Sequence, residues 1–178
     1  HRDVMYASKE CADYKPISII LTTLVGKIIE ENEIVENNTY ELLNIVLKGL
    51  EFYASLQKAG IISDFSDEYK TKQLISKRIV DGKSKWFIKN PANSAENLAD
   101  KWNIDFNYAM EFFRWVQQAQ VDLIDILDEE SSVGDIIAKL EYCLGADVAD
   151  ALESFNFLET VKTRPVELSY INPKPYQI

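Results

Sequence analysis

Histidine is the scarcest catalytic residue type in this chain, because His1 is the only one among 178 residues. Ser-His-Asp and Cys-His catalysis and histidine-based zinc sites all need a histidine held among other reactive or ligating side chains. Since the single histidine stands at one end of the sequence, we expect none of these chemistries within this chain.

Cysteine is also rare, and the chain has no long hydrophobic run. Cys11 and Cys143 are far apart and show no metal-ligand spacing. Two isolated thiols in an acidic chain fit a reducing cytoplasm better than a disulfide framework, so we expect a cytoplasmic protein. No apolar run reaches the length of a membrane span and no signal peptide is visible, so we expect no membrane partner.

Phosphate-binding and metal-binding motifs are missing as well. The sequence has no glycine-rich loop of the Walker or Rossmann type, and no Gly-Ser followed by Asp-x-Asp, the usual arrangement for metal-dependent nucleotidyl transfer. Its net charge of −10 excludes nucleic-acid binding through the overall field, so any anion site must be a local basic patch. We expect no complete catalytic centre here.

Helical periodicity dominates what is present. With 47% apolar residues, the chain is long enough for one domain with a proper core. We predict a mainly α fold, a helical bundle with a small β-hairpin. Residues 2–11 read as the last turns of a helix begun upstream, and we expect an excised piece of a longer protein. Further helices are predicted over residues 15–31, 40–58, 105–127, 132–145 and 148–158.

Two details of these helices bear on function. The aromatic stripe of helix 105–127 is typical of a core rather than of a ligand box. The acidic end of that helix, from Asp122 to Glu130, indicates a solvated face, because no histidines accompany the carboxylates to make a metal site.

The stretch Lys15 to Glu31 is the most apolar of the predicted helices. Pro16 suits a first helical position, and Asp13 could cap the helix. Apolar residues cover most of its circumference, which predicts a central helix wrapped by neighbours. The β-branched run from Ser18 to Val25 would also suit a strand, but its length and Pro16 favour a helix.

One strip of this helix differs from the rest. Ser18, Thr22 and Gly26 follow one another at intervals of four and therefore share a face, with Lys15 at its start. A ligand or another backbone could approach such small residues closely. The alternative, which composition favours, is that the hydroxyls bond back to carbonyls of their own helix.

A basic segment interrupts the acidic sequence. Asp81-Gly82, between ISKRIV and KSKWFI, is typical of a two-residue hairpin turn. The hairpin would carry a basic lip that attracts phosphates. The competing interpretation is a solvated edge whose lysines guard against aggregation. The lip consists of Lys77, Arg78, Lys83 and Lys85.

The stretch Asn90 to Trp102 follows this hairpin. Asn93 and Glu96 have the spacing of a capping box, which predicts a short helix with Leu98 and Trp102 on one face. Its asparagines and proline indicate a loop held by side-chain hydrogen bonds. We interpret the stretch as a structural corner rather than a contact site.

Two of these stretches together resemble a known family. KPISIILTTL at residues 15–24 and NPANSAENLADKW at residues 90–102, leading into FFRWVQQAQVDL, resemble the C-terminal helical half of bacterial cGAS/DncV-like nucleotidyltransferases. These CD-NTases have a SMODS-type catalytic domain. His1-Arg2-Asp3 also resembles the end of the helix that links their two lobes. The resemblance runs from residue 1 to about residue 151.

The resemblance implies the helical lobe of a two-lobed enzyme. Its N-terminal palm would hold the Gly-Ser and the acidic residues that bind Mg²⁺. The family joins ATP, GTP or other nucleoside triphosphates into cyclic di- or trinucleotides, second messengers of CBASS anti-phage defence. Ser18 matches a family serine that contacts the donor triphosphate. The family's partner lysine would lie before His1, and Arg2 is a substitute candidate; Lys15 and Thr22 complete the expected nucleotide-binding set.

These expectations fix the domain plan and the alternatives. Residues 1–163 would form the helical lobe, with the catalytic palm absent, and residues 164–178 a proline-containing tail. The partners would be nucleoside triphosphates, the catalytic lobe and a regulatory protein. The first alternative is a free-standing helical module that binds a nucleotide or a protein without catalysis. The second is a template-independent enzyme that adds nucleotides to a linear product.

Overall fold

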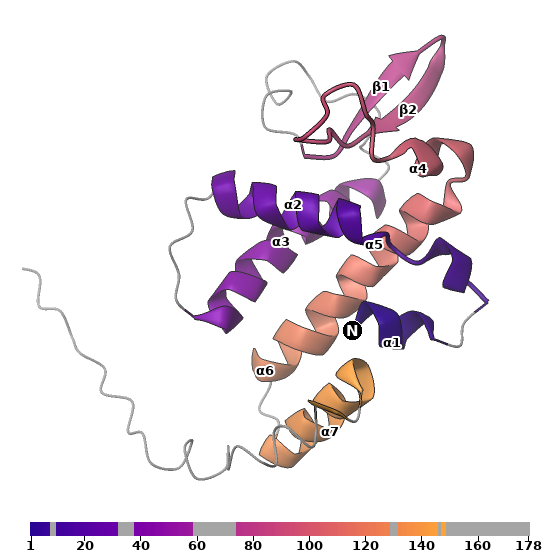
Figure 1. The fold of residues 1–178 in the computed structure, drawn as a ribbon. Helices are drawn as coiled ribbons and strands as arrows, with labels where there is room; N and C mark the ends of the chain where they lie inside the picture. Colours follow the sequence, from indigo (N-terminus) through magenta and orange to yellow (C-terminus); the bar gives the residue numbers. More distant parts are fainter. Residues whose placement is uncertain (8–9, 32–37, 59–73, 129–131, 146, 149–178) are drawn as a thin grey trace, which may run out of the picture.

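The computed structural model describes residues 1–7, 10–31, 38–58, 74–128, 132–145 and 147–148. These residues form a mainly helical fold with one two-stranded antiparallel hairpin, which confirms the predicted fold class (Figure 1). The predicted helix at 148–158 and the tail at 164–178 lie outside the described residues. No helix within the described ranges combines the length and the apolar character needed to cross a bilayer.

The elements follow one another in a simple order. The α-helices are α1 (Arg2–Tyr6), α2 (Ser18–Glu31), α3 (Thr39–Lys58), α4 (Asp100–Ile104), α5 (Asn107–Gln120), α6 (Ile126–Asp128) and α7 (Val133–Leu144). The strands of the hairpin are β1 (Ser76–Val80) and β2 (Lys83–Phe87). A 3₁₀ turn, η1 (Ala12–Tyr14), precedes α2, and a π-helical segment, η3 (Val121–Asp125), follows α5.

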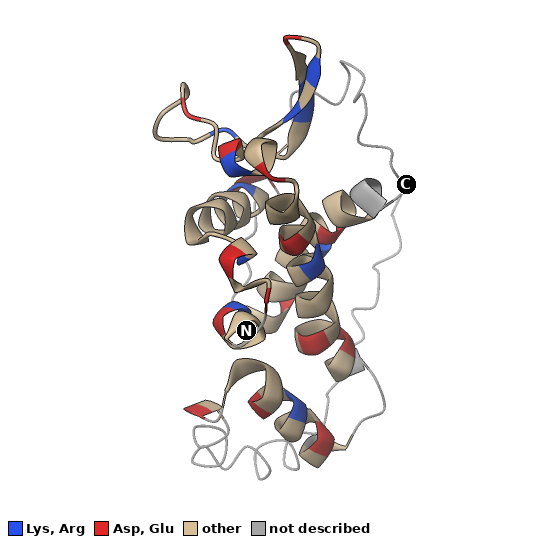
Figure 2. Cartoon of the chain, turned by 90° about the vertical axis from the view of Figure 1, so that its right-hand side faces the viewer, with Lys and Arg blue, Asp and Glu red and all other residues tan. Residues whose placement is uncertain are grey.

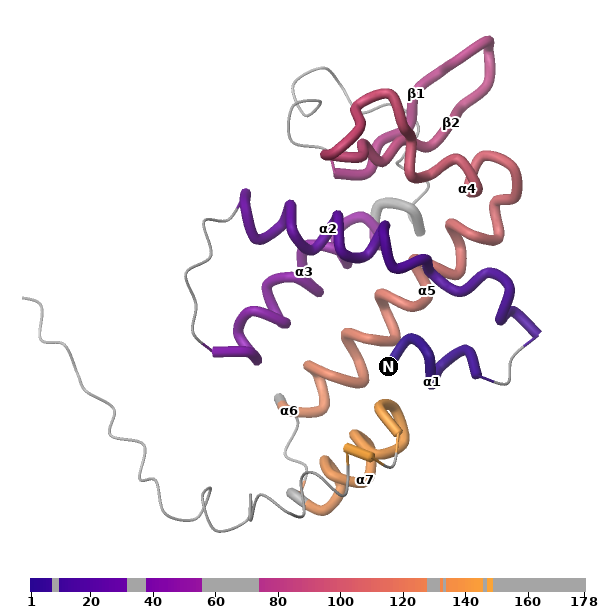
Figure 3. The backbone as a smooth tube through the Cα atoms, viewed as in Figure 1, coloured from indigo at the N-terminus to yellow at the C-terminus, as the bar shows by residue number. Residues whose placement is uncertain are grey.

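Helix α5 is the axis on which the other elements pack. It runs along α3, while α2 lies across α3 and the hairpin and α4 sit at the start of α5 (Figures 1 and 3). An aromatic cluster holds that end together, with ring centroids 5.1–5.8 Å apart. Its members are Trp86 of β2, Trp102 of α4, and Phe112 and Phe113 of α5. The cluster therefore fixes the hairpin's base to the helical body.

Side chains cap the starts of two helices, α3 and α7. Asn38 Oδ1 accepts a hydrogen bond from the Tyr40 amide at 2.9 Å at the start of α3. Ser132 and Asp135 form a reciprocal capping box at the start of α7, and Gly145 follows that helix with φ 99°. These ends are set by residues within a few positions of one another.

Helix α2 differs from the prediction of a buried helix. It begins at Ser18 rather than at Pro16, and Asp13 lies in η1 rather than at its cap. Its buried positions are Ile20, Thr23, Leu24 and Ile28. Ile19 is 48% exposed and the strip of Ser18, Thr22 and Gly26 is exposed, because α2 packs on α3 through one side only. The prediction of neighbours all round was wrong.

The predicted helix 105–127 forms as residues 107–128, with a π-helical turn within it. The helix α5 begins at Asn107, whose amide donates to Asp105 Oδ1 at 2.9 Å, and it gives way to η3 at Val121. A π-helical turn inside an α-helix shifts the later side chains around the axis and is frequent at functional sites. The shift turns Asp122 inward, where it is 7% exposed.

The corner between β2 and α4 is held by asparagine side chains. Asn103 pairs with both the amide and the carbonyl of Trp86, at 2.6 and 2.9 Å, as a neighbouring strand would. Asn97 accepts from the Ile88 amide and donates to the Trp86 carbonyl. This confirms a loop held by side-chain hydrogen bonds. The predicted capping box was wrong, because Glu96 binds Asn90 and the helix begins only at Asp100.

Candidate functional site

Three of the four residues predicted to bind a triphosphate meet where α1 lies beside the start of α2. Arg2 Nη1 donates to Ser18 Oγ at 2.7 Å and to the Pro16 carbonyl at 3.2 Å. Lys15, in the turn before α2, joins them because its Nζ donates a hydrogen bond to Asp3 Oδ1. The α2-start cluster therefore consists of Arg2, Asp3, Lys15 and Ser18.

The carboxylate of Asp3 holds the two cations of this cluster. Asp3 Oδ1 lies 3.0 Å from both Lys15 Nζ and Arg2 Nη2. Hydrogen bonds from Lys15 and then from Arg2 lower the pKa of Asp3 below its usual range. The Asp3 side chain is 70% exposed, so it can turn into solvent when a stronger anion arrives. Two cations against one carboxylate leave the cluster with a net positive charge.

Thr22 stands one turn further along α2 and does not join the cluster. Its hydroxyl donates to the carbonyls of Ser18 and Ile19, at 3.0 and 3.3 Å. The alternative in which hydroxyls bond back to their own helix therefore holds for Thr22. Ser18 Oγ instead takes its hydrogen bond from another helix.

The predicted basic lip is divided between the two faces of the hairpin. In the antiparallel register Arg78 pairs with Lys85 and Lys77 with Trp86, so Lys77 lies on the opposite face from Arg78. Lys77 Nζ sits 4.2 Å from the centroid of the Trp86 ring, and burial lowers its pKa. Arg78, Lys83 and Lys85 share the other face, and the lip is thus three residues rather than four.

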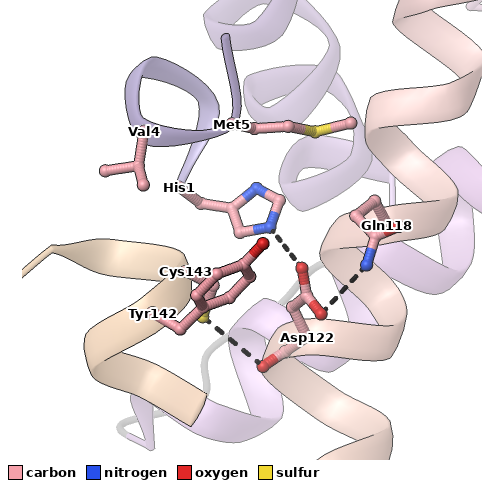
Figure 4. Close-up of a pocket in the computed structure, with 7 residues that line it drawn as sticks. All are labelled: His1, Val4, Met5, Gln118, Asp122, Tyr142 and Cys143. Atoms are coloured by element: carbon pink, nitrogen blue, oxygen red, sulfur yellow. Dashed lines mark hydrogen bonds and ion pairs between the residues drawn. The ribbon is translucent and has the colours of Figure 1, made fainter. Parts of the chain in front are cut away.

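A pocket that the sequence did not indicate lies between α1, the end of α5 and α7 (Figure 4). Its volume is about 360 Å³. His1, Val4 and Met5 come from the first turn of the chain, Gln118 and Asp122 from α5 and η3, and Tyr142 and Cys143 from α7.

A buried polar network crosses this pocket. His1 Nε2 lies 3.0 Å from Asp122 Oδ2, and Gln118 Nε2 donates to Asp122 Oδ1 at 3.0 Å. The prediction that Asp122 belongs to a solvated face was wrong, and His1 is not an isolated end residue. The two residues are 121 positions apart, so no local pattern could pair them.

The thiol in this pocket is not set up as a nucleophile. Burial, followed by the charge of Asp122, raises the pKa of Cys143, and its Sγ contacts the Asp122 carbonyl at 4.0 Å. A thiol held protonated is a poor nucleophile. Cys11 and Cys143 are both free.

Metal binding has no candidate among the described residues, because no group of three or more His, Cys, Asp or Glu side chains is placed to hold an ion there. The predicted Mg²⁺ would need carboxylates from elsewhere. Comparison with protein-family models found no matching family, and comparisons with curated proteins and with solved structures found no significant match.

Proposed function

We propose that this chain is the helical lobe of a nucleotidyltransferase that makes a cyclic di- or oligonucleotide second messenger from nucleoside triphosphates in anti-phage defence. The proposal starts from the resemblance of residues 15–24 and 90–102. The observation that carries it is the bond between Arg2 and Ser18 at the start of α2. Ser18, which matches the family serine, accepts this bond from Arg2, the candidate substitute for the family lysine.

The chemistry of the α2-start cluster suits a donor triphosphate. The guanidinium of Arg2 and the ammonium of Lys15 can bind phosphate oxygens once Asp3 turns away, and the Ser18 hydroxyl can donate to a third. The helix dipole also favours an anion at the start of α2, although the amides of Ile20 and Leu21 already donate to the Ile17 carbonyl. These groups would position the triphosphate.

Bond formation would take place outside this chain. The Gly-Ser and paired carboxylates expected to bind Mg²⁺ belong to the proposed N-terminal catalytic lobe. Mg²⁺ would supply charge neutralisation at the transferred phosphoryl group. This chain's own residues would hold the donor nucleotide against that lobe.

The decisive comparison uses two hydroxyl deletions on the same helix. In the protein that contains both lobes, Ser18→Ala should raise the KM for the donor triphosphate about tenfold, the size of a lost charge-assisted hydrogen bond. Thr22→Ala is the matched control, because that hydroxyl bonds only to its own helix. Equal effects of the two variants on KM would remove Ser18 from the site.

Product analysis and intact mass test the remaining parts of the proposal. Mass spectrometry of the reaction products separates a cyclic oligonucleotide from a linear addition product. The intact mass and N-terminal sequence of the native protein show whether a lobe with Gly-Ser and paired acids precedes His1. A native protein that begins near His1 would contradict the enzyme and favour the free-standing binding module.

A further inference from the structure

The hairpin places like charges directly opposite one another. Arg78 and Lys85 are register partners, and Lys83 lies two residues before Lys85 on the same strand, so all three share one face. No ion pair joins them to a carboxylate of the described residues. Like charges that face each other across a ladder destabilise it, so this face is least stable when no anion is bound.

An aromatic ring lies on the same face as the three cations. Phe87 follows Lys85 by two residues, and the Arg78 guanidinium carbon sits 5.0 Å from the centroid of its ring. Phe87 is half-buried and Trp86, on the opposite face, is buried in the core. We call Arg78, Lys83, Lys85 and Phe87 the basic face of the hairpin.

The basic face stands apart from the acidic body of the protein. The hairpin projects beyond the helices, at the opposite end of the molecule from α7, and its strands carry Lys and Arg (Figures 1 and 2). Because the net charge of the chain is −10, the rest of the surface repels a polyanion. A polyanion can therefore be bound only through a local basic patch that contacts a few negative groups at once, and the basic face is such a patch.

We propose that this basic face binds a short single-stranded segment of nucleic acid. Arg78, Lys83 and Lys85 would contact successive phosphates, and a base would stack on the Phe87 ring and the Arg78 plane. Cations alternating with an aromatic side chain are the usual means of single-strand binding. An acidic peptide would use the cations but gain nothing from the ring. The proposal is independent of the nucleotide site at α2, which other residues form.

The experiment measures fluorescence anisotropy of a labelled oligouridylate of about a dozen nucleotides on the whole chain. Three phosphate contacts predict a slope of about −2 for the logarithm of the binding constant against that of the salt concentration. Lys85→Glu should weaken binding about tenfold and make that slope shallower by about one. Its melting temperature should not fall, because the change replaces a like-charge pair by an opposite-charge pair with Arg78.

Two further variants distinguish a local site from a general charge effect. Lys48→Glu changes the net charge identically at an exposed position of α3 and should leave the affinity nearly unchanged. Phe87→Leu keeps an apolar side chain but removes the stacking surface, so it should weaken the oligouridylate and not a polyglutamate peptide of equal charge.

Three results would overturn the proposal. The first is the absence of oligouridylate binding at low salt. The second is an equal loss in Lys48→Glu and Lys85→Glu. The third is polyglutamate binding as tight as that of the oligouridylate together with no effect of Phe87→Leu, which would assign the face to an acidic protein partner.

Discussion

Asn103 should be far more important to stability than an average surface asparagine. Its side chain satisfies the amide of Trp86 at 2.6 Å and the carbonyl at 2.9 Å, on the edge of β2 that faces away from β1. Trp86 itself is only 3% exposed and belongs to the aromatic cluster that joins the hairpin to α5. Water cannot readily replace Asn103 at this position.

The expected loss of stability in Asn103→Ala depends on which hydrogen bonds the Trp86 amide and carbonyl retain. The carbonyl retains its bond from Asn97 Nδ2 at 2.9 Å, whereas the amide is left with no other acceptor among the residues that the structure describes. An unsatisfied buried donor costs about 1–3 kcal/mol, so we expect a loss of about 2 kcal/mol. For a chain of 178 residues this corresponds to a fall of about 4–8 °C in melting temperature.

Thermal unfolding followed by circular dichroism measures this loss, and Asn93→Ala is its control. Asn93 also accepts a backbone hydrogen bond, from the Ala95 amide at 3.2 Å, but it is exposed, so water can take its place. We expect a change within about 0.5 kcal/mol for that control. If the two variants unfolded at the same temperature, the asparagines would not act as a substitute strand.

Two other predictions concern pH and helix capping. Tyr6 donates to the Glu111 carboxylate and carbonyl, and burial, followed by that carboxylate, raises the pKa of Tyr6 far above 10. The unfolded chain ionises this tyrosine near pH 10 while the folded chain does not, so its contribution to stability is complete below pH 10 and is lost at higher pH. Urea unfolding should show a smaller alkaline loss in Tyr6→Phe; an unchanged pH profile would contradict this. Ser132→Ala should cost about 1 kcal/mol by removing the α7 cap, whereas Ser132→Asn, which keeps an acceptor, should retain most of the stability. Equal losses in the same urea assay would refute the capping role.

Features decided by a few adjacent residues could be predicted from the sequence. Asp81 and Gly82 both adopt positive φ, at 53° and 73°, as a two-residue hairpin turn of this kind requires. Asn38 and Ser132 cap their helices because their side chains compete locally for the first amides. In each case the interacting groups lie within three residues of one another.

Features that depend on which elements pack against a segment could not be predicted from the sequence. Apolar periodicity shows that α2 can be buried, but not that α3 covers one side only and leaves Ile19 half-exposed. Similarly, nothing near Asp122 in the sequence indicates a π-helical turn or a contact with His1. A π-helical turn changes the phase of the helix, and with it which side chains face the core.

The candidate site likewise has parts that the sequence predicts and parts that it does not. The resemblance predicts Ser18 and Arg2 as site residues and includes Asp3, but nothing in the sequence indicates that Asp3 holds Arg2 and Lys15 in place. The division of the basic lip between two faces of the hairpin could have been predicted from the sequence. Once Asp81-Gly82 fixes the turn, strand alternation assigns Lys77 to one face and Arg78 to the other.

The contrast between the asparagine corner and the basic face points to where selection for function has acted. At the corner the side chains of Asn90, Asn93, Asn97 and Asn103 all form hydrogen bonds, so local and global preferences agree, as they do in a purely structural element. On the hairpin, Arg78 opposes Lys85 although an acid at either position would be more stable. Natural sequences break such rules mainly at functional sites. Substitution should therefore act in opposite directions on stability at the two places: Asn103→Ala lowers it, whereas Lys85→Glu preserves or raises it while weakening the proposed binding.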